Sequence, residues 1–350
     1  MSVMIVIPSY EPQKKVISFI QRLSEQTGKN ILIVDDGSGA SYQSIFQELS
    51  VIPAVTVLSY EKNRGKGAAL KAGFQKIITE YSNVRAVVTA DSDGQHSITD
   101  ISRLIAAIEQ TDACTLLLGT RSFKKAETPF KSYWGNKISS LFFYFATGIT
   151  CEDTQTGLRA MNTSLLPSLL TVEGERFEYE MNVLLKSKAL AIKLEQLPIE
   201  TIYENNNAHS HFRAVQDSYR IYKPLFRYLS SAILSLGVDI SAFLLLLFLF
   251  GGSNEMVIPA TVIARLFSGI VNYSLARSWV FGNEERVSST LWKYGLLFLG
   301  QMVLSSLGVR LLLLILPIAL ISKLLVDGLL FGLSFIIQNR VIFQKGRVRE

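Results

Sequence analysis

Two carboxylates one residue apart, Asp91 and Asp93, have the types and spacing best suited to chemistry in this sequence. They follow residues 86–90, a mostly apolar run that predicts a buried strand. At the carboxyl end of a strand, such a pair can hold a hard divalent cation together with a diphosphate. Ligands also bind at that edge of an open α/β sheet. A lone pair of this kind more often belongs to an acidic turn that caps the next helix, so its surroundings decide the interpretation.

Three further motifs follow other apolar runs of strand length. They are Pro8–Tyr10 (P-S-Y), Val34–Ser38 (V-D-D-G-S) and Gly119–Arg121 (G-T-R). Because the carboxyl ends of parallel strands meet at one edge of a sheet, we expect these motifs to converge with the acidic pair. Unrelated turns would have no reason to carry aspartates and an arginine in this arrangement. Together the motifs predict a site for a nucleotide sugar.

The elements that must position these motifs alternate between strands and helices. Strands are expected at Val3–Ile7, Ile31–Val34, Val55–Leu58, Ala86–Ala90 and Cys114–Leu118. Helical patterns cover roughly residues 14–26, 41–49, 66–80 and 99–111. This alternation predicts an α/β fold with a mostly parallel sheet that helices cover on both faces.

A glycine-rich segment, residues 63–70, lies between the third expected strand and a helix. It lacks the spacing of a P-loop. Its glycines permit close backbone approach, and Lys66 places a positive charge at a helix N-terminus, where anions bind. A direct phosphate contact and a plain helix start are both compatible with this pattern.

The chain of 350 residues has room for two domains. Residues 1–225 have the composition of a soluble α/β protein, whereas residues 229–343 are mostly Leu, Ile, Val, Phe and Gly. The formal charge of +6 comes with basic clusters beside apolar segments, which favours anionic lipid over nucleic acid. The two cysteines lack metal-ligand spacing, so neither a disulfide framework nor a zinc site is expected. No signal-peptide pattern precedes the first strand, so we expect the first domain in the cytoplasm.

The order and spacing of these motifs resemble those of family 2 glycosyltransferases with a GT-A fold. Two later signatures, Asp153–Arg159 (D-T-Q-T-G-L-R) and Phe177–Met181 (F-E-Y-E-M), resemble the branch of dolichyl-phosphate mannose synthase and polyprenyl-phosphate glycosyltransferases. The resemblance covers nearly all of residues 1–222. It implies a Rossmann-like GT-A catalytic domain that transfers a single sugar from a nucleotide donor to a polyprenyl phosphate, with inversion.

The resemblance also implies roles for the residues that match the family's motifs. Those implied to hold the nucleoside are Pro8, Tyr10 and Asp36, with Asp35 in support. Those implied to hold Mg2+ or Mn2+ on the donor diphosphate are Asp91, Asp93 and Gln95, with Ser92 between them. Those implied to meet anionic groups are Lys66, Arg121, Lys131 at the acceptor phosphate, and Arg213 in a loop over the nucleotide. Glu11-Pro12 departs from a P-A-Y-N-E motif common in relatives, which puts one nucleoside contact and the base preference in doubt.

The chemistry implied needs no strong general base, because a lipid phosphate is already an anion near neutral pH. Catalysis would rest on positioning and electrostatic stabilisation, and the residues with implied catalytic roles are Asp93, Arg121, Lys131 and Asp153. We expect Asp153 to orient the sugar or a loop. For Glu178 and Glu180, structural, sugar-binding and proton-transfer roles all remain open. The histidines do not form a ligand set, and His96, beside the acidic motif, is the one to test.

Four apolar segments follow residue 225, each long enough to cross a bilayer core of about 30 Å. We expect a glycosyltransferase domain at residues 1–225 and a four-helix transmembrane domain at residues 226–350. The expected spans are about 229–250, 257–281, 294–316 and 319–343. Basic residues flank the middle loop and lie in the tail. The other two loops are nearly free of basic residues, with Lys323 as the exception. This distribution predicts a multi-pass plasma-membrane protein with its N-terminal domain and C-terminus in the cytoplasm.

Charged residues inside these spans need partners or a function, because a charge in hydrocarbon is costly. Asp239 with Arg265, and Arg310 with Asp327, form structural pairs or line a path for a polar headgroup, and the sequence leaves both open. The second and fourth spans end in similar sequences. The spans and these endings resemble the GtrA-like membrane family, whose members accompany glycosyltransferases and are proposed to move polyprenyl-linked sugars across the membrane.

The expected partners are a nucleotide sugar, a polyprenyl phosphate of the undecaprenyl or dolichyl type, and the membrane, with no nucleic acid. UDP-glucose, UDP-N-acetylglucosamine and GDP-mannose all remain open as donors, as does homo-oligomerisation. The alternative function is a transporter of polyprenyl-linked sugars with a regulatory or degenerate transferase domain. The intact Asp91, Asp93, Gln95 and Arg121 argue against lost catalysis. A processive synthase is disfavoured, because no Q-x-x-R-W-type sequence follows residues 177–181.

Overall fold

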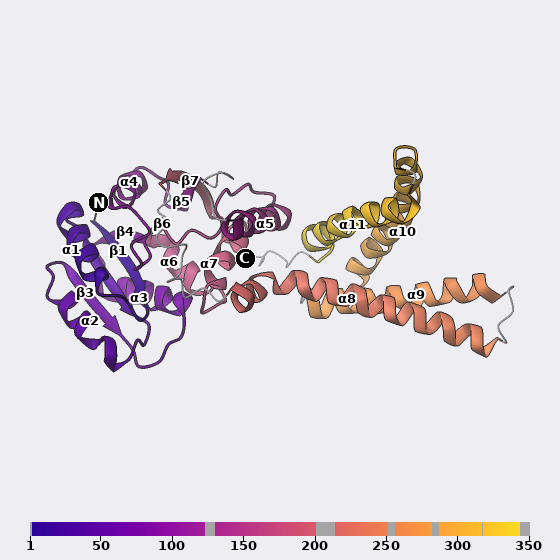
Figure 1. The fold of residues 1–350 in the computed structure, drawn as a ribbon, viewed down its shortest axis with the longest axis horizontal. Coiled ribbons are helices and arrows are strands. Elements are labelled where there is room, and N and C mark those ends of the chain that lie inside the picture. Colours follow the sequence, from indigo (N-terminus) through magenta and orange to yellow (C-terminus); the bar gives the residue numbers. More distant parts are fainter. Residues whose placement is uncertain are drawn as a thin grey trace. The chain divides into compact units, whose positions relative to one another are not determined.

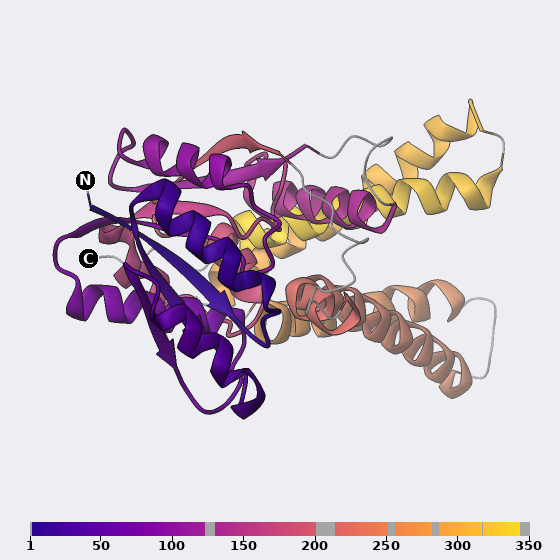
Figure 2. The same ribbon diagram turned by 60° about the vertical axis from the view of Figure 1, so that its left-hand side comes forward.

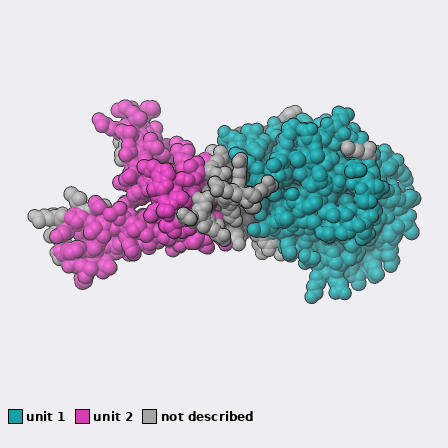
Figure 3. All heavy atoms as spheres, turned by 180° about the vertical axis from the view of Figure 1, so that it is seen from behind, with its two compact units in different colours: residues 1–221 teal, residues 222–350 magenta. Residues whose placement is uncertain are grey.

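The computed structural model describes residues 2–122, 130–200, 214–250, 256–281, 287–316 and 318–343. The chain divides into two compact units, residues 1–221 and residues 222–350, which Figure 3 colours separately.

The first unit is built on a seven-stranded sheet in the order β3-β2-β1-β4-β6-β5-β7 (Figure 1). The strands are β1 (Ser2–Ser9), β2 (Asn30–Asp35), β3 (Val55–Ser59), β4 (Val84–Thr89), β5 (Thr115–Arg121), β6 (Arg159–Asn162) and β7 (Lys193–Ile199). Strand β6 runs antiparallel to both of its neighbours, β4 and β5, while the other pairings are parallel. The mostly parallel α/β sheet predicted from the sequence is confirmed.

Helices cover both faces of this sheet (Figures 1 and 2). One face packs against α1 (Lys15–Thr27), α2 (Gln43–Ser50) and α4 (Ile98–Ile108), whose buried apolar residues join the alternate residues of β1 in one core. The other carries α3 (Lys66–Glu80), with α6 (Leu166–Leu170) and α7 (Glu178–Lys186) against it. Helix α5 (Phe130–Thr147) follows β5 in the chain. Burial of these apolar stripes, rather than helix propensity, supplies most of the stability of such helices.

The five strands and four helices expected from the sequence are all present, with ends shifted by a few residues. The local signals for the helix ends are clear. The side chain of Ser97 accepts a hydrogen bond from the backbone N–H of Asp100 at the start of α4, and Gly28 ends α1 with a positive φ of 60°. Strands β6 and β7 and helix α5 were not among the expected elements.

The topology brings the sequence motifs to one edge of the sheet. Strands β1, β2, β4 and β5 are parallel, so the residues that follow their carboxyl ends share that edge. Because β6 is antiparallel, its first residue lies there as well, and Arg159 pairs with Thr89 of β4 and Leu118 of β5. The segment that precedes β6, residues 153–158, is therefore delivered to the edge that carries the acidic motif.

The second unit is helical. Its helices are α8 (Ala214–Leu249, which begins in the first unit), α9 (Val257–Leu275), α10 (Val287–Leu313) and α11 (Ala319–Ile337). Among the described residues, Phe226–Leu249 and Val287–Leu312 are long and apolar enough to cross a membrane, with mean hydropathies of 2.4 and 1.6. Helices α9 and α11 each end in a π-helical turn, Ala276–Val280 and Gln338–Ile342. The similar sequence endings noted above therefore form the same local structure.

Polar side chains pair between the helices of the second unit. Asp239 of α8 lies 3.5 Å from a guanidinium nitrogen of Arg265 on α9, and it accepts a hydrogen bond from Ser268 at 3.0 Å. This is one of the two structural pairs that the sequence allowed. Asp327 of α11 accepts a hydrogen bond from Ser305 of α10 at 2.6 Å. Two further contacts of this kind join α8 to the π-helical turn after α11, and α9 to α10: Tyr228 with Gln338 and Asn272 with Tyr294.

Candidate active site

Asp91, directly beyond β4, is engaged on both carboxylate oxygens. Its Oδ1 lies 2.7 Å from Nζ of Lys66, and its Oδ2 lies 3.3 Å from Nε2 of His96. Burial opposes the charged form of Asp91, but the positive charge of Lys66 and the contact with His96 outweigh it. The pKa of Asp91 therefore lies well below its usual range. Asp91 is an ionised carboxylate with a cationic partner at the sheet edge.

Asp93 sits in the turn that follows, with Ser92 and Gln95 also half-buried in it. Its Oδ1 accepts a hydrogen bond from the backbone N–H of Gln95 at 3.0 Å, and Gly94 closes the turn at a φ of 80°. Burial and the nearby Asp91 both raise the pKa of Asp93. The negative charge of Asp91 thus disfavours ionisation of Asp93, and a divalent cation between the two carboxylates would relieve that repulsion.

A divalent cation fits these residues when the substrate supplies the remaining ligands. Among the described residues, no group of three or more His, Cys, Asp or Glu side chains is arranged to hold a metal. Magnesium in particular is usually bound through one or two carboxylates together with substrate phosphates and waters. The donor set of Asp91 and Asp93 matches that mode rather than an all-protein cage.

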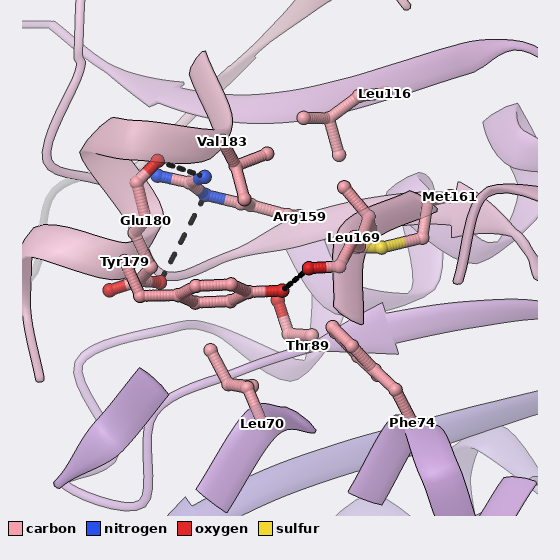
Figure 4. Close-up of a pocket in the computed structure, with 10 residues that line it drawn as sticks. All are labelled: Leu70, Phe74, Thr89, Leu116, Arg159, Met161, Leu169, Tyr179, Glu180 and Val183. Atoms are coloured by element: carbon pink, nitrogen blue, oxygen red, sulfur yellow. Dashed lines mark hydrogen bonds and ion pairs between the residues drawn. The ribbon is translucent and has the colours of Figure 1, made fainter. Parts of the chain in front are cut away.

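Lys66 connects the acidic motif to helix α7. Its Nζ lies 2.7 Å from Asp91 Oδ1 and 2.9 Å from Oε2 of Glu180. Glu180 is backed in turn by Arg159, whose Nε lies 4.0 Å from Glu180 Oε1 and whose Nη1 donates to the Glu180 carbonyl at 2.9 Å (Figure 4). Burial disfavours the Lys66 ammonium, but Asp91 and Glu180 more than compensate and raise its pKa. The result is an alternating chain of carboxylates and cations behind the site.

Gly157 allows the acidic motif and Lys66 to approach the segment before β6. Its carbonyl accepts a hydrogen bond from Thr89 Oγ1 at 2.8 Å, which fixes it beside the end of β4. A Cβ atom at this position would lie 2.7 Å from both Asp91 Oδ1 and Lys66 Nζ, closer than real contacts allow. A glycine is therefore required in the D-T-Q-T-G-L-R signature, because the Asp91–Lys66 pair fills the space that a side chain would need.

Arg121, the last residue of β5, is held by Asp153. The guanidinium donates from Nε to Asp153 Oδ2 at 2.7 Å and from Nη2 to Oδ1 at 3.2 Å, a two-pronged arrangement. Asp153 is fully buried, whereas the Arg121 side chain is 23% exposed. Helix α5 anchors this loop, since Asn136 donates to the Glu152 carbonyl at 2.6 Å. Asp153 is thus placed to orient Arg121 rather than to face solvent.

The motif after β2 orders the neighbouring loops. Both carboxylate oxygens of Asp36 accept hydrogen bonds, from the hydroxyl of Tyr60, from Asn63 Nδ2 at 3.0 Å, and from the backbone N–H groups of Arg64 and Gly65 at 2.9 and 2.8 Å. Burial and the bond to Asp36 raise the pKa of Tyr60. Asp36 therefore fixes the loop that leads into α3 and Lys66.

The remaining residues with implied nucleoside roles lie close by. Pro8 is buried in β1 beside Val34, and Tyr10 is half-buried just after that strand. Asp35 accepts a hydrogen bond from the Ser38 backbone N–H at 2.9 Å, and the Ser38 hydroxyl accepts one from the Glu11 N–H at 2.9 Å. These contacts join the ends of β1 and β2 into one surface.

For two of the implied site residues, Lys131 and Arg213, the structure describes no side-chain contacts. Lys131 lies in the first turn of α5, where its side chain is outside the described atoms, and Arg213 lies outside the described residues. Residues that sequence reasoning left without a definite role belong to the cluster: Glu180, Arg159 and Tyr60. Glu180 and Arg159 stand in the two signatures quoted above, so a signal existed for them. Tyr60 carried none, because it comes from a loop without a recognisable motif.

Comparisons with known proteins match both parts of the chain. Residues 4–169 match the family model described as glycosyl transferase family 2. This part of the chain is a family 2 glycosyltransferase domain. Residues 227–343 match a second model, the GtrA/DPMS transmembrane domain. This glycosyltransferase is therefore a membrane protein, and the family resemblance, the GT-A fold and the enzyme class inferred from the sequence are confirmed.

The names of three curated relatives of this glycosyltransferase refer to phosphates of dolichol or another polyprenol. It is 29% identical over 216 residues to the UDP-N-acetylglucosamine–dolichyl-phosphate N-acetylglucosaminyltransferase of Methanococcus voltae, covering 57% of this chain and 85% of that one. It is 24% identical over 204 residues to the polyprenol monophosphomannose synthase of Mycolicibacterium smegmatis, covering 56% and 76%. It is 28% identical over 224 residues to the dolichyl-phosphate β-glucosyltransferase of Saccharomyces cerevisiae, covering 56% and 65%. Their names share the acceptor class and differ in the sugar.

Proposed function

We propose that this glycosyltransferase transfers one sugar from a nucleotide donor to a polyprenyl phosphate on the cytoplasmic leaflet, with inversion at the anomeric carbon. The observation that carries the proposal is the convergence, at one sheet edge, of the Asp91–Asp93 carboxylates and the Arg121 guanidinium fixed by Asp153. The relatives, which share a polyprenyl-phosphate acceptor, support the acceptor class. Their different sugars leave the donor open.

Asp91 and Asp93 would hold Mg2+ or Mn2+, which when bound neutralises charge on the donor diphosphate. Gln95, in the same turn, is the third residue proposed for this role. Pro8, Tyr10, Asp35 and Asp36 would shape the nucleoside surface. In the region outside the described atoms, Lys131 and Arg213 are proposed to meet the acceptor phosphate and to cover the nucleotide.

The reaction brings together two negative charges that need electrostatic stabilisation, that of the attacking phosphate and that of the leaving nucleoside diphosphate. An oxygen of the lipid phosphate forms the new bond to the anomeric carbon while the bond from that carbon to the nucleoside diphosphate breaks. Arg121, already oriented by Asp153, supplies a fixed positive charge without reorganisation during the reaction. Because the attacking phosphate is already ionised, no side chain has to remove a proton from it.

Helix α5 offers a surface suited to the lipid part of the acceptor. Trp134, Ile138, Leu141 and Tyr144 recur at helical spacing and are 46%, 56%, 54% and 46% exposed. Apolar faces with interfacial aromatics are typical of helices that lie in a membrane surface. The opposite side of α5 holds the loop that positions Arg121. We therefore assign α5 to the bilayer surface, where it would link lipid binding to the fixed guanidinium.

Replacing both Trp134 and Ile138 by serine should raise the KM for a long-chain polyprenyl phosphate about tenfold. The reason is that the variant loses apolar side-chain area that lipid binding would remove from water. The KM for the nucleotide sugar should not change. Initial rates of the full-length protein in lipid nanodiscs measure both constants. Val51, 80% exposed on the same domain, provides the matched control as Val51→Ser. Equal KM values for the lipid in the double variant and the wild type would contradict the assignment of α5.

The membrane unit is proposed to cross the bilayer four times, with the N-terminal domain and the C-terminus in the cytoplasm. The support is the match of residues 227–343 to the transmembrane model and the basic residues around the middle loop and tail. The two long apolar helices found among the described residues agree with this arrangement.

The direct test of the function is transfer of labelled sugar to polyprenyl phosphate across a panel of UDP- and GDP-sugars. We expect product from one donor, lost on chelation of divalent metal and restored by Mg2+ or Mn2+. The coupling constant of the anomeric proton, measured by NMR, reports whether the configuration is inverted. Absence of product with every donor would contradict the proposed reaction, and product that survives chelation would contradict the metal role.

A second candidate function, transport of polyprenyl-linked sugar, is favoured by one observation: the polar pairs between membrane helices, such as Asp239 with Arg265 and Ser305 with Asp327. Charged residues within spans often mark substrate paths. If the panel gave no product while the protein still bound a preformed lipid-linked sugar, this candidate would replace the first.

A further inference from the structure

The Lys66 ammonium contacts the carboxylate oxygen of Asp91 that the proposed metal-binding role would also use. Its contact with Asp91 Oδ1 is 2.7 Å, and its second contact, with Glu180 Oε2, is 2.9 Å. The Lys66 and Glu180 side chains are 14% and 9% exposed, so water screens this contact poorly. An ammonium and a divalent cation cannot both sit against the same carboxylate oxygen. Binding of Lys66 and binding of a metal ion at Asp91 Oδ1 therefore exclude each other.

The surrounding structure fixes Lys66 in this position. The first turn of α3 is pinned to the segment before α7, because the Ala68 N–H donates to the Glu175 carbonyl at 2.8 Å. A Cβ at Gly67 would lie 2.9 Å from the Arg176 carbonyl oxygen, so the two backbones are in close contact. A Cβ at Gly157 would lie 2.7 Å from both Asp91 Oδ1 and Lys66 Nζ, so the segment before β6 also packs closely on this pair. The ammonium therefore has little freedom to leave its two partners by moving the backbone.

Glu180 gives Lys66 a partner that does not depend on Asp91. Arg159 Nη1 donates to the Glu180 carbonyl at 2.9 Å, and its Nε lies 4.0 Å from the Glu180 carboxylate. A Lys66 displaced from Asp91 would still face the carboxylate of Glu180 in a buried setting. The displacement is therefore less costly than stripping a buried ammonium of all its partners. This sharing makes an exchange between ammonium and metal at Asp91 feasible.

We propose that Lys66 is an internal counter-cation, held by Glu180 against Asp91, which competes with the divalent metal for that carboxylate and so weakens metal binding. The proposal rests on the proposed function in taking Asp91 as a metal ligand. Lys66 and Glu180 are positioning residues in this scheme. Release of Lys66 from Asp91 would also leave its charge near the donor diphosphate, so that metal and nucleotide favour each other's binding.

The test is the affinity for Mn2+ alone, measured by electron paramagnetic resonance on the full-length protein in detergent. Lys66→Met should bind Mn2+ at least about tenfold more tightly than wild type, since the competitor is gone. Glu180→Gln should bind it several-fold more weakly, since Lys66 then relies on Asp91. In the double variant Lys66→Met with Glu180→Gln, the affinity for Mn2+ should match that of Lys66→Met. This variant is also the safer one for folding, because both charges of the Lys66–Glu180 pair are removed together.

Lys71→Met is the control for a general electrostatic effect. Lys71 lies on the same helix, 4.9 Å from the ring centroid of Tyr179, and the structure pairs it with neither acidic residue of the motif. Its loss should leave the affinity for Mn2+ unchanged. Equal or weaker binding in Lys66→Met, or equally tighter binding in Lys71→Met, would overturn the proposal. So would a loss of affinity from Glu180→Gln that persists in the Lys66→Met background.

These outcomes separate this proposal from the proposed function. A wild type that transfers sugar with metal, but whose Lys66→Met variant does not bind Mn2+ more tightly, refutes the counter-cation alone. Absence of Mn2+ binding in the wild type and in every variant would refute Asp91 as a ligand and both statements with it.

Discussion

Replacing Asp93 with alanine is expected to lower the rate of sugar transfer on the order of 10³-fold, with little loss of folding stability. The variant removes one of the two carboxylates proposed to hold the cation, and with it the charge stabilisation of the leaving diphosphate. Asp93 is half-buried and its carboxylate accepts the turn hydrogen bond from the Gln95 N–H, outside the sheet, so its removal should not disturb the strands. Single-turnover rates with saturating donor measure the effect.

Asp112→Ala serves as the matched control, because Asp112 is an exposed aspartate beside the opposite end of β5. It should transfer sugar at the wild-type rate. The Asp93 variant should also fail to regain activity at raised Mn2+ concentrations if both carboxylates are needed. A rate within a factor of about 3 of the wild type would remove Asp93 from the proposed site.

Arg121→Met should combine a loss of stability with a loss of activity, and a second substitution should separate the two. Removing the guanidinium leaves the fully buried Asp153 carboxylate without its charged partner, which we expect to cost about 3 kcal/mol of unfolding free energy. Transfer should fall about 10²-fold or more, because the fixed positive charge is lost. Denaturant unfolding and steady-state kinetics are the two measurements.

The double variant Arg121→Met with Asp153→Asn decides between a structural and a catalytic role. Neutralising Asp153 removes the unpaired buried charge, so most of the stability should return. Activity should stay at the level of Arg121→Met, since the amide cannot replace the guanidinium. If activity returned together with stability, Arg121 would act only by holding the loop of residues 152–154.

The elements of the catalytic unit were predictable because their signals are local. Alternating apolar runs and helical patterns, with a cap at Ser97, gave the first five strands and their helices. The convergence of motifs at one edge also followed, because parallel strands share their carboxyl ends. Strand β6 was not predictable, since four residues carry no periodicity and its antiparallel direction depends on the neighbours it joins.

The partners within the site were beyond the sequence for a different reason. The pairing of Lys66 with Glu180, and of Arg121 with Asp153, depends on side chains that tertiary structure alone brings together. Asp36 matched a motif with an implied nucleoside role, and its four hydrogen bonds to residues 60–65 could not be read from its residue type. Sequence patterns predicted which residues gather at the sheet edge, but not which of their atoms form hydrogen bonds and ion pairs with one another there.

The insertion of β6 between β4 and β5 has a consequence for biosynthesis. During translation β5 emerges long before β6, yet β5 and β4 do not pair with each other in the finished sheet. The edge of β4 must remain unpaired until residues 159–162 leave the ribosome, and Glu180 follows later still. The catalytic edge is therefore completed only shortly before the first apolar helix is synthesised. We expect nascent chains that end before residue 159 to expose an open strand edge, a known hazard for aggregation and a natural substrate for chaperones.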